Sequence, residues 1–278
     1  TNGDDEAIAA IKHYFDLTDA GLRWVEQTRL TAEPSHLQAL LDFAAKAYRR
    51  PLSAEEREDL LEFYHTARRK NGLDHETALR ESVVLVLLSP NFSYRADLAQ
   101  DGAEIHPLSD YDLASRLSYF LWSSVPDEEL LAHASRGDLT RPEVISAQAL
   151  RMLQDPRSRA LAVEFGGNWL EFRRFEETNT VDLERYPVFT PELRRAMFEE
   201  PVRFAMDVFQ RNRSVLDFIR ARDTFVNPVL AKHYGMGGLA GTADEWIHVA
   251  DATPFGRGGL LPMAVFLTKN APGLRTRP

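Results

Sequence analysis

Histidine is the residue type most suited to metal, haem or acid–base chemistry, and its spacing in this sequence restricts that chemistry. The eight histidines occur singly, and no two are separated by three or four residues. A metal or haem site would therefore have to combine histidines from distant parts of the chain. His75-Glu76 begins like the zinc motif H-E-x-x-H, but Leu79 occupies the position of the second histidine. We predict no metal site and no cofactor bound by this chain.

The carboxylates offer one candidate for chemistry beyond helix capping. Asp110 and Asp112 fall in the first turn of a predicted helix, where capping explains them. Glu164 instead precedes Gly166-Gly167 inside a helical pattern, and two glycines there cost about 2 kcal/mol relative to alanine. Paired glycines at this cost indicate that another group approaches the helix backbone closely, either a ligand or, more commonly, a crossing helix. A third hypothesis is a hydrolase that uses Glu164 with Asp127. It requires that the carboxyl groups of these two residues lie about 5 to 9.5 Å apart.

Aromatic and cationic side chains supply the remaining candidates for a binding site. Trp122 and Trp169 follow helical apolar stripes, which is typical of core anchors, with an aromatic platform for sugar as the alternative. His233 precedes Gly235 at a predicted helix end, where the helix dipole favours imidazolium. Arg257 lies in glycine-rich sequence that suits either an anion clamp or a surface loop. The sequence identifies no catalytic residue. The candidates for a pocket or docking site are Arg116, Trp122, Glu164, Asn168, Trp169, His233 and Arg257.

The elements that must position these side chains are predicted to be helices as far as residue 234. Apolar residues between Leu37 and Tyr48 recur with helical spacing. Six helix starts carry capping or proline signals. The residues that provide these signals are Ser53 with Glu56, Asp74, Ser109 with Asp112, Thr140 with Glu143, Asp155 before Pro156, and Thr190 before Pro191. We predict an all-α fold, a multi-helix bundle in two packed helical units.

The pattern changes after Tyr234, where four glycines fall within seven residues and indicate a loop. A short strand is predicted over 245–249, and the glycine-rich segment 256–267 is predicted to be irregular because it contains Pro262. The predicted domains are therefore an N-terminal helical unit (1–100), a central helical domain (101–234) and the truncated start of an irregular C-terminal domain (235–278). Residues 100–106 are the predicted hinge between the first two.

Composition excludes several functional classes. A formal charge of −9 and an isoelectric point near 5.4 argue against a nucleic-acid partner. The longest aliphatic run, 83–88, is far shorter than the roughly 18 apolar residues of a membrane span. The absence of cysteine excludes disulfides, zinc–thiolate sites, iron–sulfur clusters and covalently attached c-type haem within these residues.

Several sequence blocks together resemble a known group of domains. The blocks are FAAKAYRRPL (43–52), LSPNFSYR (88–95), LSDYDLASRLSYFLWSS (108–124) with Pro126-Asp127, DTFVN (223–227), HYG (233–235) and RGGLL (257–261). From about residue 37 onward the chain resembles the planctomycete-type, cytochrome-c-associated helical domains of unknown function. No catalytic residue can be assigned from this resemblance, because none is established for those domains.

The resemblance implies an exported location, in the periplasm or at the cell surface, and a c-type cytochrome domain or protein as partner. It also implies that haem c belongs to that partner, that carbohydrate-like material is a possible substrate, and that the chain is a fragment. The leading hypothesis is thus a helical module of an exported oxidoreductase linked to a c-type cytochrome, with the substrate unknown. The alternative is a non-catalytic scaffold that binds polysaccharide or protein at the cell surface. A deep cleft with converging polar residues would favour the enzyme, and a shallow aromatic face would favour the scaffold.

Overall fold

The computed structural model describes residues 2–94, 107–177, 181–238, 241–242 and 244–268. It is mostly helical (66%), with twelve α-helices and one two-stranded hairpin, so the predicted all-α class is confirmed. Packing divides the chain into two compact units, Thr1–Tyr111 and Asp112–Pro278. The predicted hinge at residues 100–106 lies outside the described residues, and so do residues 269–278.

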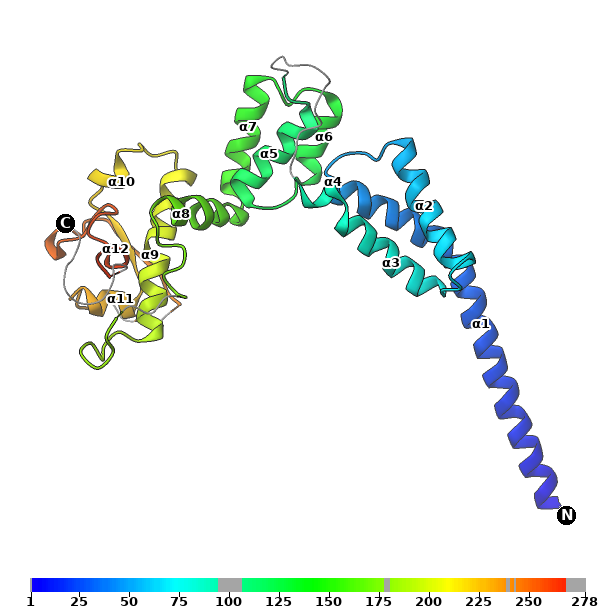
Figure 1. Cartoon of the computed structure of the whole chain (residues 1–278). Coiled ribbons are helices and arrows are strands. Elements are labelled where there is room, and N and C mark those ends of the chain that lie inside the picture. Colours follow the sequence, from blue (N-terminus) through cyan, green and yellow to red (C-terminus); the bar gives the residue numbers. More distant parts are fainter. Residues whose placement is uncertain (1, 95–106, 178–180, 239–240, 243, 269–278) are drawn as a thin grey trace. The chain divides into compact units, whose positions relative to one another are not determined.

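The first unit is built on the C-terminal part of a long helix, α1 (Asn2–Ala47), against which α2 and α3 lie (Figure 1). The elements that follow are α2 (Ala54–Arg69), α3 (His75–Leu88) and α4 (Pro90–Ser93). The predicted stripe is confirmed, because Leu40, Leu41 and Ala44 are buried with Leu60 and Val86 in one core. N-terminal to that core, α1 is exposed at every position from residue 7 to residue 31.

Two consecutive arginines explain why the sequence blocks around residues 50 and 90 occur together. Arg49 adopts a positive φ of 61°, and its Nη2 donates to the carbonyls of Asn91 (2.8 Å) and Tyr94 (3.1 Å). Arg50 donates to both carboxylate oxygens of Glu56, each at 2.8 Å. Glu56 also completes the predicted capping box with Ser53, and the hydrogen bond from Arg50 lowers the pKa of Glu56 to about 2. These contacts fix the ends of three helices.

The second unit begins with three helices, and its α5 starts just before the division between units. They are α5 (Asp110–Trp122), α6 (Glu128–Arg136) and α7 (Pro142–Gln154). The predicted Thr140–Glu143 capping box is wrong. Arg141 occupies the N-cap of α7 without a side-chain cap, and it pairs with Glu143 instead.

The remainder of this unit surrounds α9, with α10, α11 and α12 around it (Figure 1). In chain order the elements are a 3₁₀ turn (Pro156–Ser158), a π-helix (Leu161–Gly166), α8 (Gly167–Trp169), α9 (Pro191–Gln210), α10 (Asp217–Arg220), β1 (Thr224–Val226), α11 (Pro228–His233), β2 (Ile247–Val249), a 3₁₀ turn (Thr253–Phe255) and α12 (Ala264–Thr268). Strands β1 and β2 pair antiparallel, with Phe225 opposite His248.

Three sequence expectations for this region are corrected or refined. The strand predicted over 245–249 is present as β2, but β1 is a strand within the region expected to be wholly helical. The segment 256–267, predicted to be irregular, contributes four residues to the short helix α12. Residues after 234 share one core with α9, through side chains that include Met236, Leu260 and Met263.

Candidate functional site

Three of the sequence blocks converge on one buried carboxyl group, that of Glu200 on α9. Glu200 is 0% exposed. The Thr224 hydroxyl donates to its Oε1 (2.6 Å), and the Tyr234 hydroxyl donates to its Oε2 (2.5 Å). The Tyr234 hydroxyl in turn accepts a hydrogen bond from the backbone N–H of Ala264 (2.9 Å). The start of β1, the end of α11 and the start of α12 are therefore joined through one acid.

Arg257 completes this cluster from the RGGLL block. Its guanidinium lies 4.0 Å from the centre of the Tyr234 ring, and its Nη1 donates to the carbonyl of Pro262. The two glycines that follow allow this position: a Cβ at Gly258 would lie 2.7 Å from the Ala221 carbonyl oxygen, and Gly259 has φ +63°. The glycine-rich backbone thus places the Arg257 charge near enough to Glu200 to oppose the rise in the pKa of its carboxyl group.

The electrostatics of the cluster follow from its burial. Desolvation raises the pKa of Glu200 to about 7, although hydrogen bonds from Thr224 and Tyr234 and the charge of Arg257 act in the opposite direction. Burial also raises the pKa of Tyr234 above its ordinary value. Burial, and then the charge of Arg257, lower the pKa of His233. The cluster can hold a proton near neutral pH, but its acid is sealed from solvent.

Next to this cluster, α9 also borders a polar cleft of about 440 Å³. Arg159 and Arg203 both form ion pairs with Glu199. The Arg203 guanidinium also covers the ring of Trp246, 4.7 Å from the ring centre. Much of the charge in the cleft is thus neutralised within it.

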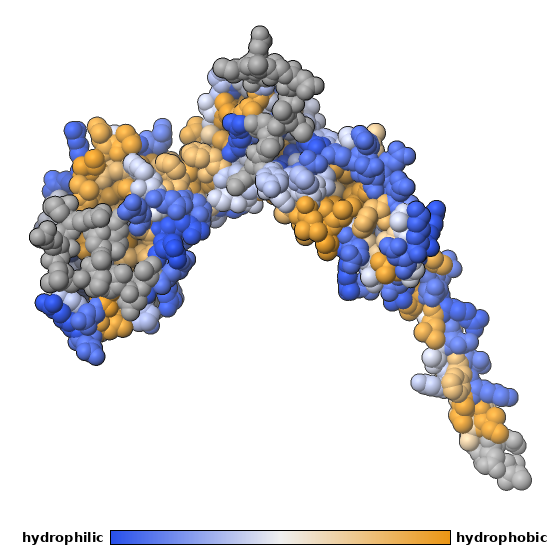
Figure 2. All heavy atoms as spheres, in the orientation of Figure 1, coloured by the Kyte–Doolittle hydropathy of each residue, from blue (hydrophilic) through white to orange (hydrophobic). Residues whose placement is uncertain are grey.

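A second cavity, of about 340 Å³, has an entirely apolar set of lining residues. Trp169 lines it and is 63% exposed. The Trp169 ring also stacks on Phe165, with centroids 5.9 Å apart, and Phe165 meets Phe120 edge to face at 6.1 Å. Hydrophobic residues gather over α10 and towards α8 in Figure 2. Exposed residues at this cavity, which we call the Trp169 patch, are Trp169, Val215, Leu216, Ile219 and Leu261.

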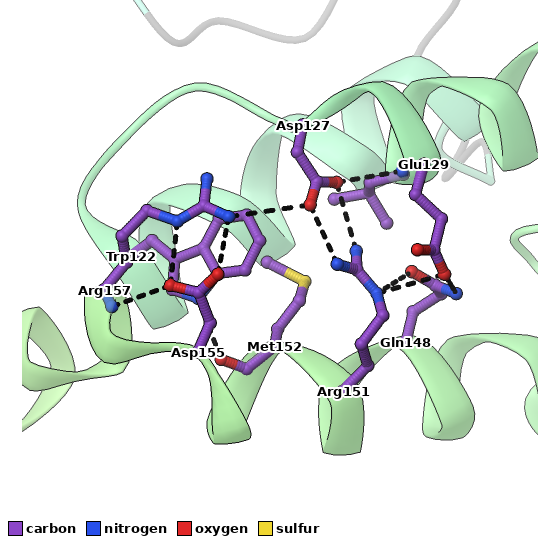
Figure 3. Close-up of polar contacts among 9 residues, drawn as sticks. Trp122, Asp127, Glu129, Gln148, Arg151, Met152, Asp155 and Arg157 are labelled. Carbon is purple, nitrogen blue, oxygen red and sulfur yellow. Dashed lines mark hydrogen bonds and ion pairs between the residues drawn. The ribbon is translucent and has the colours of Figure 1, made fainter.

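Trp122, by contrast, is a buried residue of the three-helix part (Figure 3). Its indole N–H donates to the Met152 carbonyl (2.9 Å), and the Arg157 guanidinium lies 3.5 Å from its ring centre. Asp155 holds Arg157 in place through hydrogen bonds of 2.9 and 2.7 Å. Because this cation already occupies its ring face, Trp122 does not offer a platform for sugar.

The two carboxylates of the hydrolase reading are both engaged in ion pairs. Asp127 caps α6 and accepts two hydrogen bonds from Arg151 (2.8 and 3.1 Å). Burial acts to raise the pKa of Asp127, but these hydrogen bonds outweigh it and the pKa is lowered. Glu164 accepts two from Arg173 (2.6 and 2.8 Å), which lower its pKa. Neither carboxyl retains a proton at neutral pH, which argues against either as a general acid.

The other predicted residues fall at separate places. Asn168 lies beside the Glu164 pair, and its Nδ2 donates to the Glu164 carbonyl (2.5 Å). The two glycines lie where a π-helix ends and a tight turn follows. The chain approaches itself closely there, since a Cβ at Gly167 would lie 3.1 Å from the Arg173 Cβ. Arg116 is on an exposed part of α5. Of the seven predicted residues, only His233 and Arg257 meet at the Glu200 cluster.

Sequence reasoning missed Glu200 itself, although a signal was present. Glu200 falls four residues after Ala196 and four before Phe204, within the apolar stripe of α9. A carboxylate at a core position is rare unless it is paired or protonated. That position, rather than any motif, marks this acid as unusual.

A second charged cluster, centred on Arg213, lies where α9 meets α10 and β1. Arg213 donates to both oxygens of Asp223 (each 2.8 Å), to Asp207 (2.7 Å) and to Asp217 (2.9 Å). His248 on β2 also contacts Asp223, at 2.9 Å. Burial acts to raise the pKa of Asp223, but the Arg213 and His248 hydrogen bonds outweigh it and lower the pKa to about 2. The charges in this cluster hold the strand pair against α9.

Two findings concern the described residues alone. Within them, no helix is long and apolar enough to cross a membrane. Among the same residues, no group of three or more histidine, cysteine or carboxylate side chains is arranged to hold a metal ion.

The described residues form a mostly helical protein of two compact units, which contains the buried Glu200 cluster and the exposed Trp169 patch. Residues 37–97 match PSD5, a protein of unknown function (DUF1595), and residues 108–236 match PSD4, a protein of unknown function (DUF1592). The chain therefore contains these two domains, which are planctomycete-type and often linked to cytochrome c. No curated protein and no solved structure matches the chain.

Proposed function

We propose that this chain is a helical docking module of an exported oxidoreductase whose haem belongs to a c-type cytochrome domain or protein. The link between these domains and cytochrome c supports the choice of partner. The absence of cysteine means that the chain has no Cys-x-x-Cys-His attachment site of its own. A periplasmic or cell-surface location and a carbohydrate-like substrate for the assembled protein are parts of the same proposal.

The exposed Trp169 patch is the observation that carries the docking role. Ile219 and Leu261 are 64% and 69% exposed beside Trp169, around a cavity without polar lining residues. Contiguous exposed apolar surface of this kind marks interaction sites in soluble proteins. Tryptophan next to a pocket is also the residue type that most often dominates binding energy at protein interfaces.

The patch favours docking over catalysis by this chain alone. The Glu200 cluster is sealed, and Asp127 and Glu164 are held ionised by arginines. A non-catalytic scaffold that binds polysaccharide or protein at the cell surface is the second candidate, and the exposed aromatic ring of Trp169 favours it. The cleft beside Trp246 does not add support for glycan binding, because the Arg203 guanidinium covers the Trp246 ring.

Binding of a separately expressed c-type cytochrome domain, taken from a protein that carries both kinds of domain, tests the proposal. Trp169→Ala is expected to weaken the complex roughly 30-fold, because truncation of a central aromatic typically costs about 2 kcal/mol. Isothermal titration calorimetry measures the dissociation constants. Tyr186→Ala is the matched control, since Tyr186 is an exposed aromatic residue that does not line the cavity. Absence of binding by the wild-type chain, or equal affinities for all three proteins, would contradict docking through this patch.

A further inference from the structure

The first unit contains a continuous chain of hydrogen bonds that ends at two histidines. The Tyr64 hydroxyl donates to Glu33 Oε1 (2.6 Å) and lies 2.7 Å from His75 Nδ1. His75 Nε2 lies 2.9 Å from His36 Nδ1. Glu33 and His36 are three residues apart on α1, Tyr64 is on α2, and His75 is the first residue of α3. The chain thus joins all three long helices of this unit.

Hydrogen-bond accounting fixes the tautomer of His75. Because the Tyr64 hydroxyl gives its only proton to Glu33, it must accept from His75, which places the His75 proton on Nδ1. The other nitrogen, Nε2, then presents a lone pair to His36. The two ring planes differ by 10°, with centroids 5.2 Å apart. Since face-to-face rings lie about 3.5 Å apart, a nitrogen–nitrogen distance of 2.9 Å requires the rings to meet edge to edge.

We infer that His36 Nδ1 and His75 Nε2 are the two protein ligands of a divalent transition metal, for which Zn²⁺ is the probe. Imidazole nitrogens in the plane of their rings are the donors that zinc, copper and nickel prefer. Zinc–nitrogen bonds of about 2.0–2.1 Å at a tetrahedral angle need nitrogens about 3.4 Å apart. The pair must therefore open by about half an ångström, while His36 moves its proton to Nε2.

The surroundings of His75 are those of a metal ligand. Metal-binding histidines almost always donate the second ring N–H to a carboxylate, a carbonyl or another acceptor, which fixes the ring and raises its basicity. Here the Tyr64 hydroxyl is that acceptor, and its own hydrogen bond to Glu33 couples His75 to the negative charge of that carboxylate. Arg68 is 3.9 Å from Glu33 and reduces this charge in part. His36 is exposed, so an ion can enter from solvent and water can complete its coordination.

Calorimetric titration of the tag-free full chain with Zn²⁺ tests the inference. Saturable binding of one ion is expected, and His36→Ala is expected to weaken it at least tenfold. His13→Ala is the matched control, because His13 is another exposed histidine on α1. Tyr64→Phe keeps the buried ring but removes the acceptor of the His75 proton, and is expected to weaken binding 10–100-fold. Helicity measured by circular dichroism verifies that each variant is folded.

A second measurement separates a metal site from a simple histidine pair. In ¹⁵N-resolved spectra of the metal-free chain, His75 is expected as the Nδ1–H tautomer, and Zn²⁺ is expected to shift His75 Nε2 and His36 Nδ1 together. Mg²⁺, which prefers oxygen ligands, is expected to shift neither. No Zn²⁺ binding, or binding with equal affinity in wild type, H36A and Y64F, would overturn the inference.

Discussion

The stability of the Glu200→Gln variant relative to the wild-type chain is expected to rise by about 3 kcal/mol as the pH increases from 4.5 to 8. Burial raises the pKa of Glu200 in the folded protein to about 7, whereas the ordinary value is 4.5. Each pKa unit of difference corresponds to about 1.4 kcal/mol of folding free energy. Glutamine is never ionised, yet its amide can still accept from Tyr234 and donate to the Thr224 oxygen. The variant therefore avoids the loss of folding free energy that the wild type undergoes as pH rises.

The sign follows from proton uptake. Between pH 4.5 and 7 the folded chain retains a proton on Glu200 that the unfolded chain has released, so the free energy of unfolding falls as pH rises. The contribution of this proton is complete below the unfolded pKa and is lost above the folded one. Urea unfolding at pH 4.5, 6 and 8 measures the effect, with exposed Glu184→Gln as control. A constant difference between wild type and E200Q across this range would show that folding does not raise the pKa of Glu200.

The second large effect is expected for Arg213→Ala, which should destabilise the second unit by about 3 to 5 kcal/mol. Its guanidinium is the shared hydrogen-bond donor to Asp207, Asp217 and Asp223. Removal of one partner from a largely buried ion cluster costs this much because the remaining charges stay desolvated and repel one another. Chemical denaturation at pH 7 measures the loss. Substitution of Asp223 by asparagine in the R213A background is expected to recover part of it.

Arg211→Ala provides a close control for this substitution. Arg211 also pairs with Asp207, at 2.8 Å, but its side chain is 66% exposed whereas that of Arg213 is 20% exposed. Exposed ion pairs contribute about 0 to 1 kcal/mol. Similar losses for R211A and R213A would mean that burial does not set the strength of this cluster.

Local signals in the sequence predicted most of the helices. The stripe between Leu37 and Tyr48, the Ser53–Glu56 box and the Asp74 cap depend on neighbours within four residues, and each is present in the structure. Strand β1 was not predicted because it is only three residues long and its pairing with β2 lies more than twenty residues away. The Thr140 cap failed because Arg141 precedes a proline at the first helical position and takes the N-cap itself.

Sites assembled across the chain were less accessible to sequence reasoning. His233 and Arg257 were candidates by residue type, but their meeting point depends on Glu200, more than thirty residues earlier. The His36–His75 pair joins residues 39 positions apart, so a search for spacings of three or four could not find it. Trp169 was a candidate whose exposure depends on how the π-helix and α8 turn, which periodicity does not determine.

The exposed part of α1 has a consequence for how this helix exchanges its amide protons with solvent. Residues 7–31 form about seven turns, roughly 37 Å long, that are exposed throughout and whose side-chain hydrogen bonds, such as that from Thr18 to the Tyr14 carbonyl, join residues of the same helix. Most helical stability in proteins comes from packing against a core, which exposed turns do not have, whereas residues 40–47 share the protection of the core. One uninterrupted helix therefore contains a fast-exchanging half and a slow-exchanging half, and the boundary between them falls near the residues that first contact α2 and α3.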